Sequence, residues 1–479
     1  MNLYDIIVCV VYFFLIIVIG VIARGKNHTT HDFYLAGRSM SWFPVGLSVM
    51  ITVFSAINFV AVPQEVAVYG LYVMASLPVF ILVGIPVARY FIPRFYQQGS
   101  VSAYEFLEQR FDVKVRCLAS GMFIFWRMLW MGVVLFATAK ILTLITGFSL
   151  PLLIIVCGVV AMAYTAWGGI RAVIWTDVAQ FIILLTGLLM IIVILVVKSK
   201  NGFAGMIAIT RSHGLLKPFS PFDSGFFSPD PTIRISFFSC LIGVFVAFLT
   251  RYGADQIVIQ RYSTAKSLQA AKTSFWWNII CAMFSIALLG IFGLMLYNYA
   301  AEHNLLTPDK TLAAPLKIIK IIFSTLPYGG GGLMIAGLLA ATMSSIDSGI
   351  NACSAAWFSD FHQRFFEKER EEGREWQYSI YLTLTVGSVS IFLALLCMAF
   401  LAQSNTVFVM INKIIHGLGS PLLAIMLLAM LSKRISAKAV FEGTISGFIC
   451  SIMTVFLIKG LALHYYAVVN LIITLGLCY

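Results

Sequence analysis

Long apolar runs separated by short polar segments fill almost the whole chain. A helix needs about 20 mainly apolar residues to cross a hydrocarbon core about 30 Å thick. Thirteen runs are candidates for such spans, and they cover residues 4–23, 42–69, 72–95, 118–146, 150–166, 173–197, 234–252, 268–301, 331–357, 377–401, 406–431, 440–461 and 464–479. The pattern predicts an all-α polytopic membrane protein with about 13 transmembrane helices.

The composition supports this prediction, because 60% of the 479 residues are hydrophobic and only 11% are charged. A soluble protein of this size could not keep so much apolar surface away from water. The net charge of +12 comes from Lys and Arg in short loops, not from a basic and aromatic groove, so we expect no nucleic-acid partner. The glycine run 329–332 lacks the Gly-Lys-Ser/Thr ending of a phosphate-binding loop, which disfavours an ATP-driven pump.

The distribution of basic residues predicts the orientation. Of the 32 Lys and Arg residues, 20 lie in segments 24–41, 89–117, 164–172, 251–273, 358–376 and 432–440, and 10 lie in the segments on the other side. Cytosolic loops carry the excess of basic residues in membrane proteins. We therefore expect a multi-pass protein of the cell membrane with its N-terminus outside and its C-terminus in the cytosol.

The order of the spans predicts two similar halves. We divide the chain into a leading helix and loop (1–40), a first five-helix repeat (41–198), an extracellular connection (199–233), a second five-helix repeat (234–431) and two peripheral helices (432–479). Five is an odd number, so the second copy starts from the opposite side of the membrane and the repeat is inverted. Polar residues, glycine and proline interrupt the first span of each half, at 55–65 and at 243–255. Such interruptions predict unwound backbone beside a transport site.

The apolar stretch 338–351 carries an unusual set of polar residues. On a helix, Ala341, Ser344, Ser345 and Ser348 share one face, and Asp347 lies about 60° from Ser344 on its edge. Hydroxyls and a carboxylate are costly in hydrocarbon unless they are satisfied, and hard oxygen ligands suit a small hard cation. For a single serine, a hydrogen bond back to its own helix is the alternative. The complete face favours an ion site.

Several ordered motifs together resemble those of the sodium:solute symporter family. They lie at 33–38, 104–111, 164–180, 260–262 and 343–348, so the resemblance extends over most of the chain, from 33 to about 425. It implies a leucine-transporter-like inverted repeat of five plus five helices. It also implies sodium-driven symport by alternating access, with a sodium ion and a small-molecule solute as the transported partners.

The resemblance also implies two ion sites. The first would bind sodium between the first and eighth core helices, through the backbone carbonyls of Ala56, Phe59 and Ala341 and the hydroxyls of Ser344 and Ser345. The second sodium, bound in some members, would use Asp177 with Ser344 and Ser348, and with Asp347 as a possible addition. Arg171, six residues before Asp177, is the structural alternative as a partner for this carboxylate.

The stretch 54–65 is similar to the branch of the family that carries iodide, monocarboxylates, vitamins and sialic acid. Trp130 stands where sialic acid carriers place an arginine, and Arg127 lies three residues earlier. Arg127 and Lys413 are intramembrane cations and hence functional candidates, although a structural partner for Arg127 and snorkelling of Lys413 to the surface are open alternatives. The predicted substrate contacts are Asn58, Gln64, Arg127, Trp130, Phe245, Phe248, Asn412 and Lys413.

These observations predict a secondary active transporter and not an enzyme. We expect sodium-driven symport of a small polar organic solute, an organic anion such as a monocarboxylate or acidic sugar. A sodium-coupled symporter of a neutral sugar or polyol is the alternative, and a channel or a solute sensor is the alternative of another class. A sensor of this fold would carry a long signalling domain, whereas the chain ends at Tyr479. We expect it to work as a monomer in the lipid bilayer.

Overall fold

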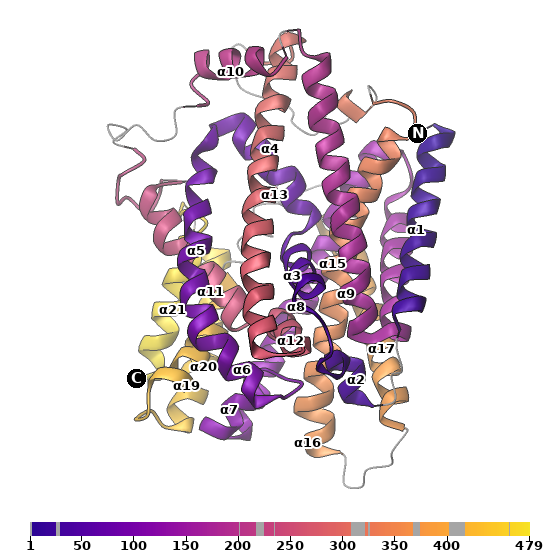
Figure 1. Cartoon of the computed structure of the whole chain (residues 1–479). Coiled ribbons are helices and arrows are strands. Elements are labelled where there is room, and N and C mark those ends of the chain that lie inside the picture. The colour runs from indigo at the N-terminus through magenta and orange to yellow at the C-terminus, as the bar shows by residue number, and fades with distance from the viewer. Residues whose placement is uncertain are drawn as a thin grey trace.

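The computed structural model shows a bundle of long helices that run between two ends of the molecule (Figure 1). It describes residues 2–24, 29–200, 202–216, 225–233, 235–307, 321–323, 326–366, 374–401, 417–458 and 460–479. The N-terminus lies at the end that carries the short helix α10 (Gly202–Ser212), and the C-terminus lies toward the end that carries α7 (Glu105–Arg110).

Eight helices in the described part of the chain are long and apolar enough to cross a membrane, or up to ten if each bent pair counts as one span. Seven of them are α1 (Leu3–Ala23), α8 (Val113–Thr146), α9 (Leu150–Lys198), α13 (Leu268–Glu302), α15 (Gly330–Trp357), α17 (Arg374–Leu401) and α20 (Ala437–Leu457). A further span, Leu71–Gln98, joins η2 (Leu71–Ser76), α5 (Leu77–Pro86), η3 (Val87–Phe91) and α6 (Ile92–Gln98). The shorter α19 (Ser420–Leu431) and α21 (Tyr465–Cys478) are also apolar, and the total of thirteen stays a prediction.

The predicted spans 150–166 and 173–197 are both part of α9, which is 49 residues long. A straight helix of that length would measure roughly 70 Å, more than twice the hydrocarbon thickness. Gly169 interrupts it with φ 60° and ψ −164°. A Cβ atom at this position would lie 2.7 Å from the carbonyl oxygen of Phe33, so glycine alone fits the close approach. Gly169 therefore separates the two spans.

Two bent helix pairs occupy the places where the sequence predicts broken spans. The first joins α3 (Trp42–Val53) to α4 (Ala56–Tyr69) at an angle of 64°. The second joins η4 and α11 (Ser239–Gly253) to α12 (Gln256–Thr264) at 52°. The first predicted interruption was too long, because α4 continues through Pro63 and only Phe54 and Ser55 separate the two helices.

The ion-site helix α15 lies at the centre of the bundle. All of its residues except Leu333 and Trp357 are buried, and it packs against α9, α8, α1, α3 and α17. Its first turn lies directly against α1, where a Cβ on Gly332 would lie 2.5 Å from the backbone oxygen of Asp5. The Asp5 carboxylate accepts a hydrogen bond from the Gly332 N–H at 2.9 Å and so caps α15.

A charged cluster joins the ends of three elements at the α7 end of the molecule. Arg116 of α8 donates to Asp360 of η5 (Phe358–His362) at 2.7 Å and to Glu108 of α7 at 2.8 Å. Burial opposes ionisation of Glu108, but hydrogen bonds from Arg116 and Arg364 outweigh it and lower the pKa of this carboxyl. The apolar side chains at the start of α7, Tyr104, Phe106 and Leu107, are buried in the protein.

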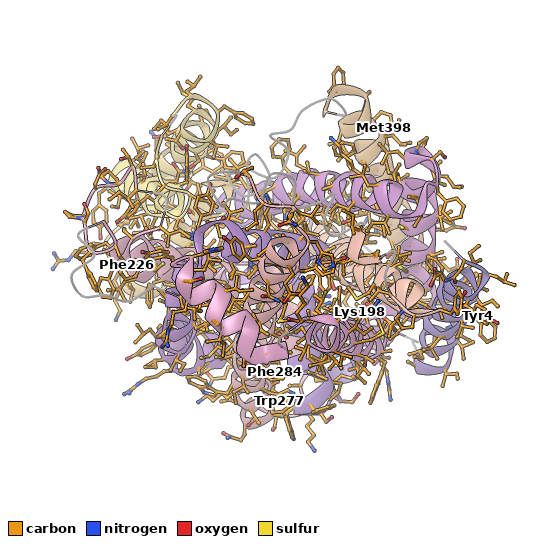
Figure 2. The ribbon with its side chains drawn as sticks, turned by 90° about the horizontal axis from the view of Figure 1, so that it is seen from above. Tyr4, Lys198, Phe226, Trp277, Phe284 and Met398 are labelled. Atoms are coloured by element: carbon orange, nitrogen blue, oxygen red, sulfur yellow. The ribbon has the colours of Figure 1, made fainter. Side chains whose placement is uncertain are left out.

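The remaining helices lie at the periphery. α20 and α21 pack against each other and against α19. The short α2 (Thr30–Leu35) and η1 (Ala36–Arg38) connect α1 to α3, and α16 (Gln363–Phe365) follows η5. Seen from above, Tyr4, Phe226 and Met398 lie near the rim on different sides (Figure 2). Many large apolar side chains are exposed there, as a lipid-facing surface requires.

Candidate functional site

The serines of α15 face the end of α3, where the first broken helix stops. The Ser344 hydroxyl donates to the backbone oxygens of Ile51 at 3.3 Å and Ala341 at 3.2 Å. The Ser345 hydroxyl donates to the backbone oxygens of Thr52 at 3.3 Å and Ala341 at 3.2 Å. The last carbonyls of a helix lack full helical partners, so the end of α3 presents backbone oxygens to α15, although the Ile51 carbonyl also accepts a hydrogen bond from the Phe54 N–H at 3.2 Å. The two hydroxyls therefore form hydrogen bonds back to their own helix, as the sequence left open, and they also contact the break.

The predicted ligands Ala56 and Phe59 lie on the other side of the break, in the first turns of α4, and are buried. The serine hydroxyls contact Ile51 and Thr52 in this structure. Pro63 has no N–H to donate to the carbonyl four residues earlier, which is that of Phe59. The structure thus brings Ala341, Ser344 and Ser345 together with the break, while the contribution of Ala56 and Phe59 stays a prediction.

A second buried polar cluster surrounds Asp177 of α9. Its Oδ2 atom accepts hydrogen bonds from the Ser48 hydroxyl of α3 at 2.6 Å, from Arg261 Nη2 of α12 at 3.3 Å and from Thr52 Oγ1 at 3.5 Å. Its Oδ1 atom is buried and has no hydrogen-bond partner. A carboxylate oxygen that is buried and unpartnered can coordinate a cation.

Ser348 of α15 connects Asp177 to Asp347. The Ser348 hydroxyl donates to Asp347 Oδ1 at 3.1 Å, lies 3.0 Å from Thr52 Oγ1 and accepts a hydrogen bond from Arg261. Asp347 Oδ2 accepts a hydrogen bond from the Tyr164 hydroxyl. All of these side chains are buried, so Asp347 belongs to the same cluster as Asp177.

The charges in this cluster do not balance. Two carboxylates, Asp177 and Asp347, face one guanidinium, Arg261, and all three side chains are almost completely buried. With both carboxylates ionised the cluster carries one negative charge in excess. An uncompensated charge in a dry interior costs several kcal/mol, so the cluster favours a monovalent cation or a proton.

Arg171, the expected structural partner of Asp177, is exposed and is not that partner. The partner is Arg261, which belongs to the recognised motif 260–262 but was not among the predicted site residues. Helical spacing could not relate these two residues, because they lie on different helices 84 positions apart. The signal that could have found Arg261 is the rule that a buried arginine in a span requires a carboxylate.

Arg127 of α8 forms an ion pair with Asp255, which lies at the break of the second bent pair. Asp255 also caps α12 by accepting a hydrogen bond from the Ile257 N–H at 3.1 Å. The guanidinium carbon of Arg127 lies 4.4 Å from the ring centroid of Trp126 and 4.8 Å from that of Trp130. The charge of Arg127 is therefore compensated within the protein.

The other predicted substrate contacts that the structure describes lie on the helices of the two bent pairs. The Asn58 side chain accepts hydrogen bonds from the Ser55 N–H and hydroxyl, each at 3.2 Å, and so caps α4. Gln64 is partly buried in α4, and Phe245 is partly buried in α11. The Phe248 ring lies 4.3 Å from that of Phe80. Asn412 and Lys413 lie outside the described residues.

Arg251 is a residue that was not among the predicted site residues. The sequence places it where the predicted span 234–252 and the cytosolic segment 251–273 overlap, and in the structure α11 runs from Phe245 to Gly253 with the break after it. Arg251 therefore lies inside the second bent pair, with its guanidinium carbon 5.6 Å from the ring centroid of Phe248. A cation at this depth is a functional candidate.

Comparison with known proteins gives one family for almost the whole chain. Residues 33–447 match the model of the Sodium:solute symporter family. A sodium-dependent multivitamin transporter from Oryctolagus cuniculus is 32% identical over 89% of this chain and 65% of its own length. Sodium-coupled monocarboxylate transporter 1 from Mus musculus is 30% identical over 90% of this chain and 69% of its own length. The sodium/iodide cotransporter from Homo sapiens is 30% identical over 71% of this chain and 52% of its own length. The chain thus spans about two thirds of the length of the first two, and all three are transporters.

Solved structures show the same fold. A sodium-coupled sialic acid symporter in a substrate-bound, outward-open state has a TM-score of 0.88 and 24% identity over 99% of this chain and 97% of its own. MhsT in complex with L-phenylalanine has a TM-score of 0.54 and 15% identity, over 91% of this chain and 98% of its own. These likenesses confirm the predicted leucine-transporter-like fold.

Proposed function

The chain belongs to the sodium:solute symporter family, and on that basis we propose that it is a secondary active transporter that couples a small polar organic solute to sodium by alternating access. The observation that carries the proposal is the meeting of α15 with the first break. Two serines of α15, Ser344 and Ser345, contact the last carbonyls of α3, beside a buried cluster with an excess negative charge.

The first sodium would bind at Ala56, Phe59, Ala341, Ser344 and Ser345. A hydroxyl that donates to a carbonyl keeps its lone pairs for a cation, so the bonds of Ser344 and Ser345 to α3 are compatible with this role. Pro63 supports Phe59 as a ligand because it leaves that carbonyl without a helical donor. A sodium ion there would join α15 to both sides of the break.

The second sodium would bind at Asp177 with Ser344, Ser348 and Asp347. The unpartnered Oδ1 of Asp177 and the uncompensated charge of the cluster support this site. Arg261 ties Asp177 to α12, the inner part of the second bent pair. An ion at Asp177 would therefore act on the first and second bent pairs together, since Ser48 and Thr52 of α3 also contact this carboxylate.

The solute would bind between the two breaks, near Asn58, Gln64, Trp130, Phe245 and Phe248. Relatives named for monocarboxylates, a vitamin and iodide support an organic anion such as a monocarboxylate or acidic sugar. A neutral sugar or polyol is the second candidate, because Arg127 is already compensated by Asp255. Asn58 and Gln64 would then make the polar contacts.

Uptake by the purified chain in proteoliposomes tests the function. A symporter concentrates a solute when sodium is high outside, and an ionophore that collapses the sodium gradient stops accumulation. A channel equilibrates the solute without concentrating it, and a sensor binds it without transport. Accumulation that ignores the sodium gradient would contradict the proposal.

A further inference from the structure

Arg251 is a cation inside a broken span, and it has no counter-ion in the described part of the chain. It lies near the end of α11, and its side chain is partly accessible although Tyr252 and Gly253 next to it are buried. It forms no ion pair and no hydrogen bond with any residue in the described part of the chain. Its guanidinium carbon lies 5.6 Å from the ring centroid of Phe248. An arginine at this depth is costly unless something compensates its charge.

The neighbouring charges leave one positive charge in excess. Arg251 interacts electrostatically with Arg127 and with Asp255. Asp255 is already paired with Arg127, and the sequences of α8, α11 and α12 contain no other carboxylate. Two guanidinium groups therefore share one carboxylate. The region can accept one further negative charge.

The surroundings determine what kind of anion fits. A guanidinium forms two parallel hydrogen bonds to a carboxylate, and these bonds are strong where water is excluded. The ring of Phe248 lies near Arg251, and the rings of Trp126 and Trp130 lie near Arg127, so each arginine has an aromatic surface beside it. A carboxylate joined to a small organic group matches both features.

We infer that Arg251, not Arg127, binds the carboxylate of a monovalent organic anion, and that Phe248 contacts the rest of this solute. The inference rests on the proposed symport function and assigns its charge-bearing contact. An inorganic monovalent anion such as iodide shares the charge but not the paired oxygens of a carboxylate. Arg127 serves the site indirectly, because its ion pair fixes Asp255 at the break and so leaves Arg251 uncompensated.

Uptake of radiolabelled solutes into proteoliposomes tests this assignment, because it also detects symport of one sodium ion with one monovalent anion, which moves no net charge. The solutes are pyruvate, nicotinate, pantothenate, N-acetylneuraminate and iodide, with lactamide and glucose as neutral probes, each with and without sodium. The variants are Arg251→Gln, Arg251→Lys and the control Arg171→Gln, which removes an exposed arginine. For a transported carboxylate, Arg251→Gln should raise the half-saturating concentration about tenfold or more, because a charge-assisted pair is lost. Arg251→Lys should restore part of the affinity, and Arg171→Gln should leave it unchanged.

Each other result overturns the assignment in a distinct way. Carboxylate uptake that Arg251→Gln and Arg251→Lys leave unchanged would remove Arg251 from the site while sodium symport stands. Sodium-dependent uptake of only the neutral solutes or only iodide would overturn the organic anion and leave symport intact. Carboxylate uptake that needs Arg251 but not sodium would instead contradict the proposed function. No uptake of any of these solutes would overturn the assignment of an organic anion.

Discussion

At the scale of single residues, the serines of α15 already have partners within the protein. Ser344 and Ser345 share the Ala341 carbonyl and contact α3, and Ser348 lies between two carboxylates. Their removal therefore tests the ion sites only when it is compared with the removal of an equally buried serine elsewhere on this helix.

Replacing Ser345 by alanine removes one oxygen from the proposed first sodium site. We expect the half-saturating sodium concentration of uptake to rise about tenfold, or roughly 1.4 kcal/mol, because neutral oxygens provide no charge to offset a missing ligand. Ser354→Ala is the matched control, since the Ser354 hydroxyl donates to the Ile350 carbonyl of the same helix at 2.7 Å. Wild-type sodium affinity in both Ser344→Ala and Ser345→Ala would rule out the first site.

Replacing Asp177 by asparagine keeps the shape of the side chain but removes its charge. We expect the sodium dependence of uptake to become less steep, because the second ion loses its charged ligand. The measurement is a sodium titration of initial uptake rates. Asp360→Asn is the control, since Asp360 is equally buried and paired with Arg116. If both variants only lower the amount of folded protein, the role of Asp177 is structural.

At the scale of the elements, interruptions determine how the helices meet. The break between α3 and α4 exposes carbonyls to α15, the break before α12 places Asp255 beside Arg127, and Gly169 allows α9 to turn against Phe33. These interruptions are required by the packing, because a continuous helix would satisfy its own backbone and leave no free oxygens.

Gly169→Ala tests the interruption in α9. An alanine at φ 60° and ψ −164° costs roughly 1–3 kcal/mol, and its Cβ would also lie 2.7 Å from the Phe33 carbonyl oxygen, so we expect a lower midpoint of thermal unfolding. Gly121→Ala is the control, because Gly121 lies in α8 with no atom within 4 Å of an added Cβ. We expect that control to be neutral or slightly stabilising. Equal midpoints for the two variants would contradict the strain at Gly169.

At the scale of the whole molecule, the two ends of the chain lie toward opposite ends of the bundle (Figure 1). The structure contains no membrane, so the orientation rests on the basic residues of the loops. The charged cluster of Arg116, Asp360 and Glu108 lies at the same end as the predicted cytosolic loops. This arrangement is consistent with an inner surface rich in charge.

Cysteine labelling of whole cells tests the orientation. We expect a membrane-impermeant maleimide to modify Lys200→Cys in intact cells and Lys433→Cys only after permeabilisation, because the positive-inside rule places them on opposite sides. Both lysines are exposed, and the nine native cysteines are buried or partly buried, which limits the background. The reverse pattern would overturn the proposed orientation together with the assignment of inner and outer surfaces.

The sequence by itself determined the fold class, the places of the broken spans and the face of α15 that carries Ala341, Ser344, Ser345 and Ser348. Each follows from local rules, since apolar length predicts a span, polar and small residues predict a break, and helical spacing predicts a face. The recognised motifs supplied the family.

Only the tertiary structure decided which charges meet. Arg261 and not Arg171 pairs with Asp177, Asp255 compensates Arg127, and Arg251 lies beside Phe248 with no ion pair among the described residues. The two pairs join elements that are 84 and 128 positions apart in the sequence, and their contact depends on packing that no local pattern encodes. In a dry interior the charge balance is set by all neighbouring side chains together. For that reason the uncompensated cation at the second break became visible only when the helices were assembled.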